Sequence, residues 1–263
     1  MSRKLIVADL SSARRARSAH CENPPPAAPL RPVPRPLRGL MLDFGGVLYD
    51  DTVWRRWLLR LLSHLGLRAH FRSFFHVLEH EYMVQVYTGQ ATFCEALSRF
   101  LTSAGLSSGQ IDEVLAACHG RRRALEESTR PLPGVRCTLA RLKKQGLKLG
   151  LLSDSELSSD EIRGQLDRFA ASDTFCSVVS SFDVGCTKPT PICYQRTLDE
   201  MGLPGREVAY VGHDPAELEG ARRLGMATIA FNAPGETVAE VHIDRFEQLA
   251  EVALPSRELA AAG

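Results

Sequence analysis

The segment Leu40-Met41-Leu42-Asp43-Phe44-Gly45-Gly46 joins a short apolar run to a carboxylate and two glycines. An apolar run of this kind is typical of a buried strand, which we expect over residues 38–43. In an open α/β sheet, ligands bind beyond the carboxyl ends of the strands, where Asp43 would lie. The glycines allow a sharp turn and a close backbone approach to a bound group. Asp43 is therefore a candidate nucleophile toward a small anionic substrate, or else the first residue of a simple β-turn.

Beyond this segment the hydrophobic pattern changes twice. From residue 52 to about residue 129 the apolar side chains recur at helical spacing, and nothing there resembles a strand. After Pro131-Leu132-Pro133-Gly134, helices alternate with apolar strands. Such alternation predicts a parallel sheet covered by helices on both faces. We therefore expect an α/β fold: a doubly wound, Rossmann-like core, with residues 52–129 forming an all-helical cap inserted just after Asp43.

The two ends of the chain differ from the middle. Residues 1–37 hold seven of the fifteen prolines, and Arg and Lys outnumber Asp and Glu there by seven to two. The stretch from Pro24 to Pro36 cannot form a helix or a central strand, so we expect residues 1–37 to be a disordered tail. The α/β core would comprise residues 38–51 and 130–250, and residues 251–263 would form a flexible C-terminus.

The composition excludes several classes of protein. The hydrophobic fraction is 44% and the charged fraction 24%, which is typical of a soluble globular protein. A net charge of +1 gives no field that would attract nucleic acid or a membrane surface. No apolar stretch approaches the roughly 20 residues needed to span a bilayer. The seven cysteines are scattered without a CxxC pair, which favours reduced thiols, a cytoplasmic location and no zinc site. The sequence leaves the oligomeric state open.

Four polar groups follow successive apolar strands. These are Asp43, Ser153 (with Asp154 next to it), Lys188 and Asp214. In a doubly wound sheet the ends of these strands converge on one crevice. A hydroxyl and backbone N–H groups could hold phosphate oxygens there, a lysine could offset negative charge, and two acids could hold Mg²⁺. The set predicts a site for phosphoryl transfer.

The order of these segments resembles the haloacid dehalogenase-like (HAD) hydrolase superfamily, which consists mostly of phosphatases. Leu42-Asp43-Phe44-Gly45-Gly46-Val47-Leu48 resembles its first motif, which carries the aspartate nucleophile. The Ser153 segment resembles the second motif, Thr187-Lys188-Pro189-Thr190-Pro191 the third, and Tyr210-Val211-Gly212-His213-Asp214 the fourth. The resemblance covers about residues 38–246, and the helical insertion matches the cap of that family.

This resemblance implies a Mg²⁺-dependent phosphatase that acts on a small phosphorylated metabolite through an aspartyl-phosphate. The catalytic residues would be Asp43, Ser153 and Lys188. The substrate would be bound by Gly45, Gly46, Ser153, Asp154 and Lys188, and Mg²⁺ by Asp43, the Gly45 carbonyl and Asp214. The cap would close over the site and select the substrate.

Two positions depart from the family pattern. Gly45 stands where the phosphatases usually carry a second aspartate, which protonates the leaving group and then activates water; such proton transfer is worth about 10²–10⁴ in rate. Asp50 is a candidate substitute, but Asp50 and Asp51 equally suit the start of the first cap helix. At the second position, His213 replaces an acid that usually binds the metal.

The segment Asp214-Pro215-Ala216-Glu217 has two interpretations. Asp214 could bind the metal in place of His213, and Glu217 is a further candidate. The same four residues also match an N-cap, a proline at the first helical position and the reciprocal glutamate of a capping box.

Two other functions fit the altered motifs. A metal-independent 2-haloacid dehalogenase-type hydrolase would also lack the second aspartate. A catalytically impaired HAD-fold binding protein would explain both Gly45 and His213, with the proline-rich tail as an adaptor.

Overall fold

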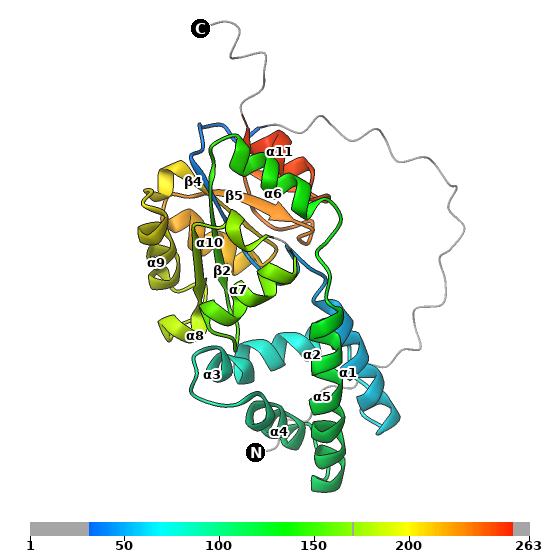
Figure 1. Cartoon of the computed structure of the whole chain (residues 1–263). Coiled ribbons are helices and arrows are strands. Elements are labelled where there is room, and N and C mark those ends of the chain that lie inside the picture. The colour runs from blue at the N-terminus through cyan, green and yellow to red at the C-terminus, as the bar shows by residue number, and fades with distance from the viewer. Residues whose placement is uncertain (1–31, 170, 255–263) are drawn as a thin grey trace, which may run out of the picture.

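The computed structural model describes residues 32–169 and 171–254. Its centre is a six-stranded sheet with the order β3-β2-β1-β4-β5-β6, in which every neighbouring pair is parallel. Helices cover both faces, so the predicted doubly wound α/β class is confirmed (Figure 1). The strands are β1 (Gly39–Leu42), β2 (Lys148–Ser153), β3 (Ser177–Ser180), β4 (Val208–Gly212), β5 (Ala227–Phe231) and β6 (Val241–Ile243).

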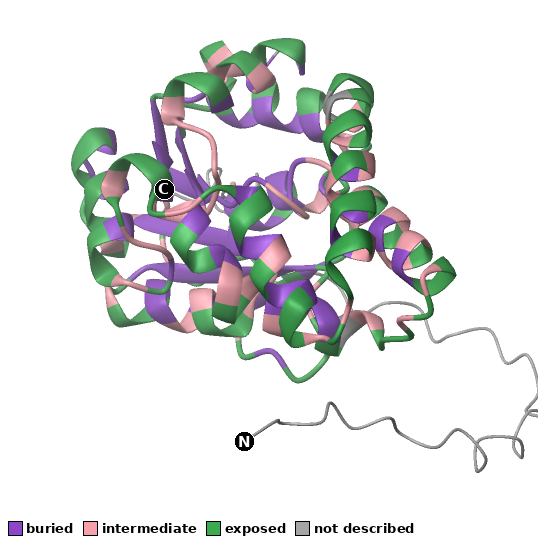
Figure 2. Ribbon diagram, turned by 90° about the horizontal axis from the view of Figure 1, so that it is seen from below, coloured by how far each residue is buried: buried purple, intermediate pink, exposed green. Residues whose placement is uncertain are grey.

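Alternation along the central strand builds a hydrophobic core on each face of the sheet. Leu40 and Leu42 contribute to one core, with α6 (Val135–Lys144), α7 (Ser159–Arg168) and α11 (Gln248–Ala253). Met41 points the other way, because successive strand side chains alternate, and it joins the second core. The helices of that second face are α9 (Pro191–Met201) and α10 (Pro215–Arg223). Figure 2 shows the buried sheet between helices whose outer faces are exposed.

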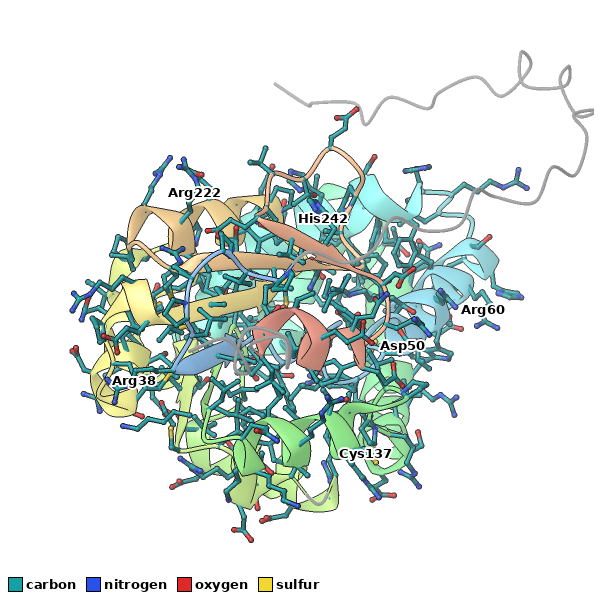
Figure 3. The ribbon with its side chains drawn as sticks, turned by 90° about the horizontal axis from the view of Figure 1, so that it is seen from above. Arg38, Asp50, Arg60, Cys137, Arg222 and His242 are labelled. Carbon is teal, nitrogen blue, oxygen red and sulfur yellow. The ribbon has the colours of Figure 1, made fainter. Side chains whose placement is uncertain are left out.

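The outer helix faces carry charged residues that bond locally. On α10, the Arg222 guanidinium donates to Glu219 at 2.9 Å, and Figure 3 shows Arg222 projecting from the periphery of the fold. Such exposed pairs add little to stability, because solvent and salt screen them, so the two buried cores dominate the stability of the fold.

The strand order creates a crevice at the middle of the sheet. From β1 the chain proceeds outward to β2 and β3, then returns to β4 and continues outward to β5 and β6 on the other side. The connections on the two sides therefore diverge between β1 and β4, which is where doubly wound sheets bind ligands. Asp43 directly follows β1 at this point, and its N–H donates to the Val211 carbonyl of β4 at 2.9 Å.

Between residues 52 and 129 every regular element of the structure is helical, as the sequence predicts. These helices have their own core around Leu58, Leu97 and Phe100, and Trp54 and Trp57 pack against it. The elements of this block, called the cap below, are α1 (Thr52–His64), α2 (Phe71–Val77), the π-helical turn η1 (Leu78–Met83), α3 (Val84–Tyr87), α4 (Phe93–Ser103) and α5 (Ser108–Ser128).

Parts of the predicted tail and C-terminus, residues 1–31 and 255–263, lie outside the described residues. Nearer the core, Val33 is buried and its N–H donates to the Val252 carbonyl in α11 at 2.9 Å. The first and last described segments of the chain are therefore hydrogen-bonded to each other on one face of the sheet. No helix within residues 32–254, residue 170 aside, has the length and apolar character to cross a membrane.

Candidate active site

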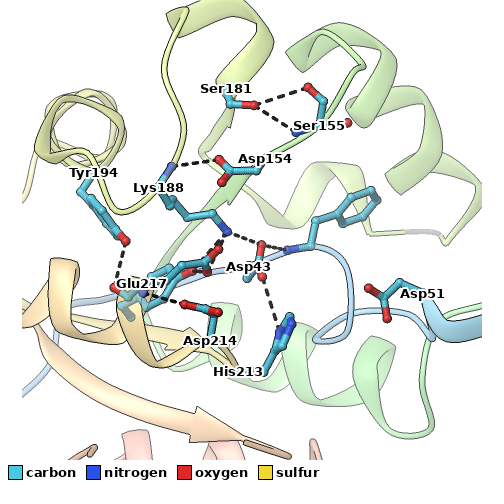
Figure 4. Close-up of polar contacts among 12 residues, drawn as sticks. Asp43, Asp51, Asp154, Ser155, Ser181, Lys188, Tyr194, His213, Asp214 and Glu217 are labelled. Atoms are coloured by element: carbon cyan, nitrogen blue, oxygen red, sulfur yellow. Dashed lines mark hydrogen bonds and ion pairs between the residues drawn. The ribbon is translucent and has the colours of Figure 1, made fainter. Parts of the chain in front are cut away.

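Asp43 and Lys188 form a buried ion pair at the end of β1. Lys188 Nζ lies 2.7 Å from Asp43 Oδ1, and the Phe44 N–H donates to the same oxygen at 2.8 Å. The two side chains are only 1% and 9% exposed, for Lys188 and Asp43 respectively. Two residues 145 positions apart in the chain, both predicted for the site from sequence, are thus in direct contact. Both hydrogen bonds reach Oδ1, so Oδ2 is the oxygen available to a substrate (Figure 4).

Lys188 is surrounded by three carboxylates. Besides Asp43, its Nζ lies 3.0 Å from Glu217 Oε2, and its backbone N–H donates to Asp154 Oδ1 at 3.1 Å. Burial lowers the pKa of Lys188, but the charges of Asp43, Glu217 and Asp154 together raise it well above its usual value. The lysine therefore remains a cation at any pH at which the protein would work.

Glu217 has a different role from those considered from sequence. Its Oε2 accepts a hydrogen bond from the Tyr210 hydroxyl at 2.7 Å in addition to the contact with Lys188. Burial raises the pKa of Glu217, and this outweighs the lowering by Lys188 and by the Tyr210 hydrogen bond. Only half of the predicted capping box forms: Asp214 Oδ1 accepts from the N–H groups of Ala216 at 2.8 Å and Glu217 at 3.1 Å. The Glu217 side chain faces Lys188 instead.

Ser153 and Asp154 stand at the end of β2, beside β1. Ser153 is buried, and both residues line the same cavity as Asp43. Burial raises the pKa of Asp154 to about 7, although Lys188 acts in the opposite direction. Hydrogen bonds fix the loop that follows, since the Ser155 N–H donates to Ser181 Oγ at 3.0 Å.

The cavity above these residues lies between the sheet edge and the cap, with a volume of about 660 Å³. A cavity of this size suits a small metabolite. Core residues line its floor and cap residues its roof, so a ligand on Asp43 would be covered by the cap. The lining includes Asp43, Ser153, Lys188 and His213 from the core and Trp54, Arg55, Met83, Tyr87 and Arg122 from the cap.

Gly46 and His213 are packed together beside Asp43. Gly46 has φ of +72°, and a Cβ there would lie 3.0 Å from His213 Cε1, so both conformation and space favour glycine. The Gly46 N–H donates to the Tyr49 carbonyl at 2.9 Å and is already used within the turn. His213 Nδ1 is buried without a hydrogen-bond partner among the described residues, and it lies 3.7 Å from Asp43 Oδ2. The imidazole thus stands next to the oxygen that would face a substrate.

The donors near Asp43 can be compared with the needs of Mg²⁺. No three His, Cys, Asp or Glu side chains within the described ranges converge as a ready metal cage. Mg²⁺ keeps several waters, however, and is usually bound by one or two carboxylates together with substrate phosphate. Asp43 Oδ2 faces the cavity, and Asp214, which also lines it, uses only Oδ1 for its helix cap. The donor set therefore fits a hydrated ion with few protein ligands, and the imidazole of His213 is a poor Mg²⁺ ligand.

The two acids that precede α1 are in different environments. Asp50 Oδ1 accepts from the Thr52 N–H at 2.9 Å and from Thr52 Oγ1 at 2.6 Å, so Asp50 holds the start of α1. Asp51 makes no side-chain capping bond. Its Oδ2 instead lies 2.7 Å from Arg55 and 3.6 Å from the place that a Cβ on Gly45 would occupy. The capping interpretation thus holds for Asp50 and not for Asp51.

The fold and site define a known class of enzymes. The sequence pattern of haloacid dehalogenase-like hydrolases matches residues 37–225, and the chain belongs to this family. The resemblance inferred from the four motifs is therefore confirmed, and the protein is a hydrolase.

Several relatives in this family are phosphatases. The phosphoglycolate phosphatase of Yersinia pestis is 26% identical over 217 residues, covering 79% of this chain and 88% of that protein. The glyceraldehyde 3-phosphate phosphatase of Methanocaldococcus jannaschii is 35% identical over 212 residues, covering 73% and 84%.

Solved structures show the same fold at low sequence identity. A β-phosphoglucomutase from Clostridium difficile superimposes with a TM-score of 0.59 at 15% identity, covering 86% of this chain and 96% of that one. The L-2-haloacid dehalogenase of Xanthobacter autotrophicus gives 0.56 at 17% identity, covering 82% and 97%. At these identities the likeness concerns the fold alone.

Proposed function

We propose that the protein is a Mg²⁺-dependent phosphatase that acts on a small phosphorylated metabolite through an aspartyl-phosphate at Asp43. The observation that carries this proposal is the buried Asp43–Lys188 pair, 2.7 Å apart, at the floor of a covered cavity of about 660 Å³. The phosphatase relatives support the same reaction class.

In this mechanism, Asp43 Oδ2 attacks phosphorus while Lys188 and the Phe44 N–H hold Oδ1. A bond forms between Oδ2 and phosphorus. The bond from phosphorus to the substrate oxygen breaks, and this oxygen keeps the electron pair, takes a proton from solvent and departs as an alcohol. The Ser153 hydroxyl holds a phosphoryl oxygen, and Lys188 stabilises the negative charge that develops. Water then cleaves the aspartyl-phosphate and regenerates Asp43.

Mg²⁺, when bound by Asp43, the Gly45 carbonyl and Asp214, would offset phosphate charge beside Lys188.

The test is phosphate release from a panel of small phosphorylated metabolites, with Mg²⁺ and with excess chelator. We expect Mg²⁺-dependent release from at least one substrate. Asp43→Asn should abolish it, because the amide keeps the shape but is not a nucleophile, and a cooperative unfolding transition would verify that the variant still folds. Turnover by Asp43→Asn, or no release from any substrate by the wild-type protein, would contradict the proposal.

Carbon–halogen hydrolysis is the second candidate, because His213 Nδ1 lies 3.7 Å from Asp43 Oδ2 and no second aspartate stands at position 45. A dehalogenase would release chloride from a 2-haloacid in the presence of chelator. Phosphate release that requires Mg²⁺ would exclude this alternative.

A further inference from the structure

Because position 45 is a glycine, the proposed reaction lacks the aspartate that usually transfers protons in the phosphatases of this family. Hydrolysis of an aspartyl-phosphate is accelerated by a base that takes a proton from the attacking water. The carboxylates of Asp154 and Glu217 both face Lys188, the former bonded to its backbone N–H and the latter to its ammonium group. They are held on the lysine side of Asp43, so the base should come from the opposite side.

Asp51 is a carboxylate on that opposite side. Its Oδ2 lies 3.6 Å from where the first side-chain atom of a residue larger than Gly45 would be. Asp51 lines the cavity that contains Asp43 and is only 17% exposed. Figure 4 shows Asp51 and Lys188 on opposite sides of Asp43. A carboxylate delivered by the start of α1 thus occupies the space left free by glycine.

The position of Asp51 is not explained by helix capping. It occupies the N-cap position of α1 but accepts no backbone hydrogen bond there, while Asp50 holds the first turn. Arg55 orients it instead, with a nitrogen 2.7 Å from Asp51 Oδ2 and 2.8 Å from Glu79 Oε1. The Arg55 guanidinium, held between two acids, thus fixes the position of the Asp51 carboxylate at the wall of the cavity.

We propose that Asp51 is the general base for hydrolysis of the aspartyl-phosphate, an inference that rests on the proposed phosphatase function. The Asp51 carboxylate takes one proton from water as the water oxygen bonds to phosphorus. The bond between phosphorus and Asp43 breaks, and its electron pair returns to the Asp43 carboxylate. Inorganic phosphate leaves, and the proton on Asp51 passes to solvent or to the leaving oxygen of the next substrate.

The test uses p-nitrophenyl phosphate with excess Mg²⁺ and the full chain. Nitrophenolate departs without needing a proton, so its release reports attack by Asp43, whereas phosphate release reports attack by water. In Asp51→Asn we expect a fast burst of one nitrophenol per protein, then steady turnover slower by about 10²–10⁴. Intact mass spectrometry should show a phosphoryl group retained on the protein.

A rescue variant and a neighbouring control complete the design. Gly45 has ordinary backbone φ and room for a Cβ, so the double variant Gly45→Asp/Asp51→Ala should restore turnover at least about tenfold over Asp51→Ala. Asp50→Asn, which keeps an acceptor for Thr52, should behave as wild type. Melting temperatures verify folding, and the Asn variant is decisive even if the double variant fails to fold.

The outcomes separate this inference from the proposed function. An active wild type with normal phosphate release in Asp51→Asn, or with burst and steady rates lowered equally, overturns the role of Asp51 alone. A burst phenotype in His213→Gln but not in Asp51→Asn would assign the base to His213 instead. A wild type that releases neither nitrophenol nor phosphate overturns the phosphatase proposal and the inference together.

Discussion

At the scale of single residues, the site concentrates acids around one ammonium group. Asp43, Asp154 and Glu217 all interact with Lys188, so the carboxylates exceed the lysine in number. Because the cluster is buried, ionising each further acid costs free energy. The result is a site that favours added positive charge or added protons, and this has a measurable dependence on pH.

Asp154→Asn should reveal that dependence in metal-free protein. Burial raises the pKa of Asp154 from 3.8 to about 7, so between these values the folded state binds more protons than the unfolded state. Stability should therefore fall as pH rises through this window, by about 2–4 kcal/mol for this group. The asparagine does not ionise. Relative to the wild type, the free energy of unfolding of the variant, measured with urea, should therefore increase between pH 5 and pH 8. Parallel stability curves would show that Asp154 ionises normally.

Tyr210→Phe tests the hydroxyl that lies between Glu217 and Lys188. The hydroxyl donates to Glu217 at 2.7 Å and lies 3.3 Å from Lys188 Nζ. Removing it leaves a buried carboxylate with one donor fewer, which should cost about 1–3 kcal/mol of unfolding free energy. Tyr82→Phe removes a hydroxyl whose bond to Ser103 is exposed, and its cost should be smaller. Equal costs for the two variants would argue against the Glu217 contact.

The sequence alone could predict a residue's place in the site when that place depends only on the end of a strand. Asp43, Ser153 and Lys188 were predicted for one site because each lies at or beyond the carboxyl end of a strand, and the structure places all three around one cavity. Glu217 was misjudged as a reciprocal cap, because i, i+3 spacing fits a capping box whether or not the side chain turns back. Asp51 was grouped with Asp50, since only the tertiary position of Gly45 and Arg55 distinguishes two adjacent acids.

At the scale of elements, the start of α10 serves two purposes in our proposal. Asp214 caps the helix through Oδ1 and, as proposed, contributes to Mg²⁺ binding. Asp214→Ala should lower the unfolding free energy by about 0.5–2 kcal/mol, whereas Asp214→Ser should retain most of it, because serine is also a good N-cap. Both variants should bind Mg²⁺ more weakly in calorimetric titration. A serine variant with unchanged Mg²⁺ affinity would restrict Asp214 to capping.

Helices and strands could be predicted from the sequence where their hydrophobic pattern is strong, and were missed where it is weak. The apolar runs at residues 177–180 and 227–231 of the sequence coincide with β3 and β5. No strand was predicted at β6, which has three residues with an exposed His242 at its centre. The π-helical turn η1 was also not anticipated, because its residues keep a helical pattern while the hydrogen bonding differs.

At the scale of the whole molecule, the cap and the core are joined by contacts near the cavity. Ser181, in α8 (Ser181–Val184), donates to the Tyr87 carbonyl of the cap at 2.8 Å and accepts from the Ser155 N–H at 3.0 Å. Nearby, the Phe182 ring lies 3.2 Å from where a Cβ on Gly89 would be. One buried hydroxyl thus connects the cap to the loop that follows β2.

Ser181→Ala should loosen this junction. The Tyr87 carbonyl and the Ser155 N–H would each lose a buried partner, at about 1–3 kcal/mol in total. We expect faster hydrogen exchange around residues 87–89 and 155, and a higher KM with a smaller change in kcat. Thr102→Ala, whose hydroxyl bonds only within α4, is the control. Unchanged exchange at both segments would show that the junction does not depend on Ser181.

The connection from β1 to α1 has a mechanical consequence. Residues 43–51 begin at the proposed nucleophile, which is anchored to the sheet, and end at Asp51, which is carried by the first turn of the cap. Any swing of the cap about this tether moves one carboxylate while the other stays in place. In the proposed mechanism, an opened cap would therefore also separate Asp43 from Asp51, and the aspartyl-phosphate would be hydrolysed efficiently only while the cap is closed.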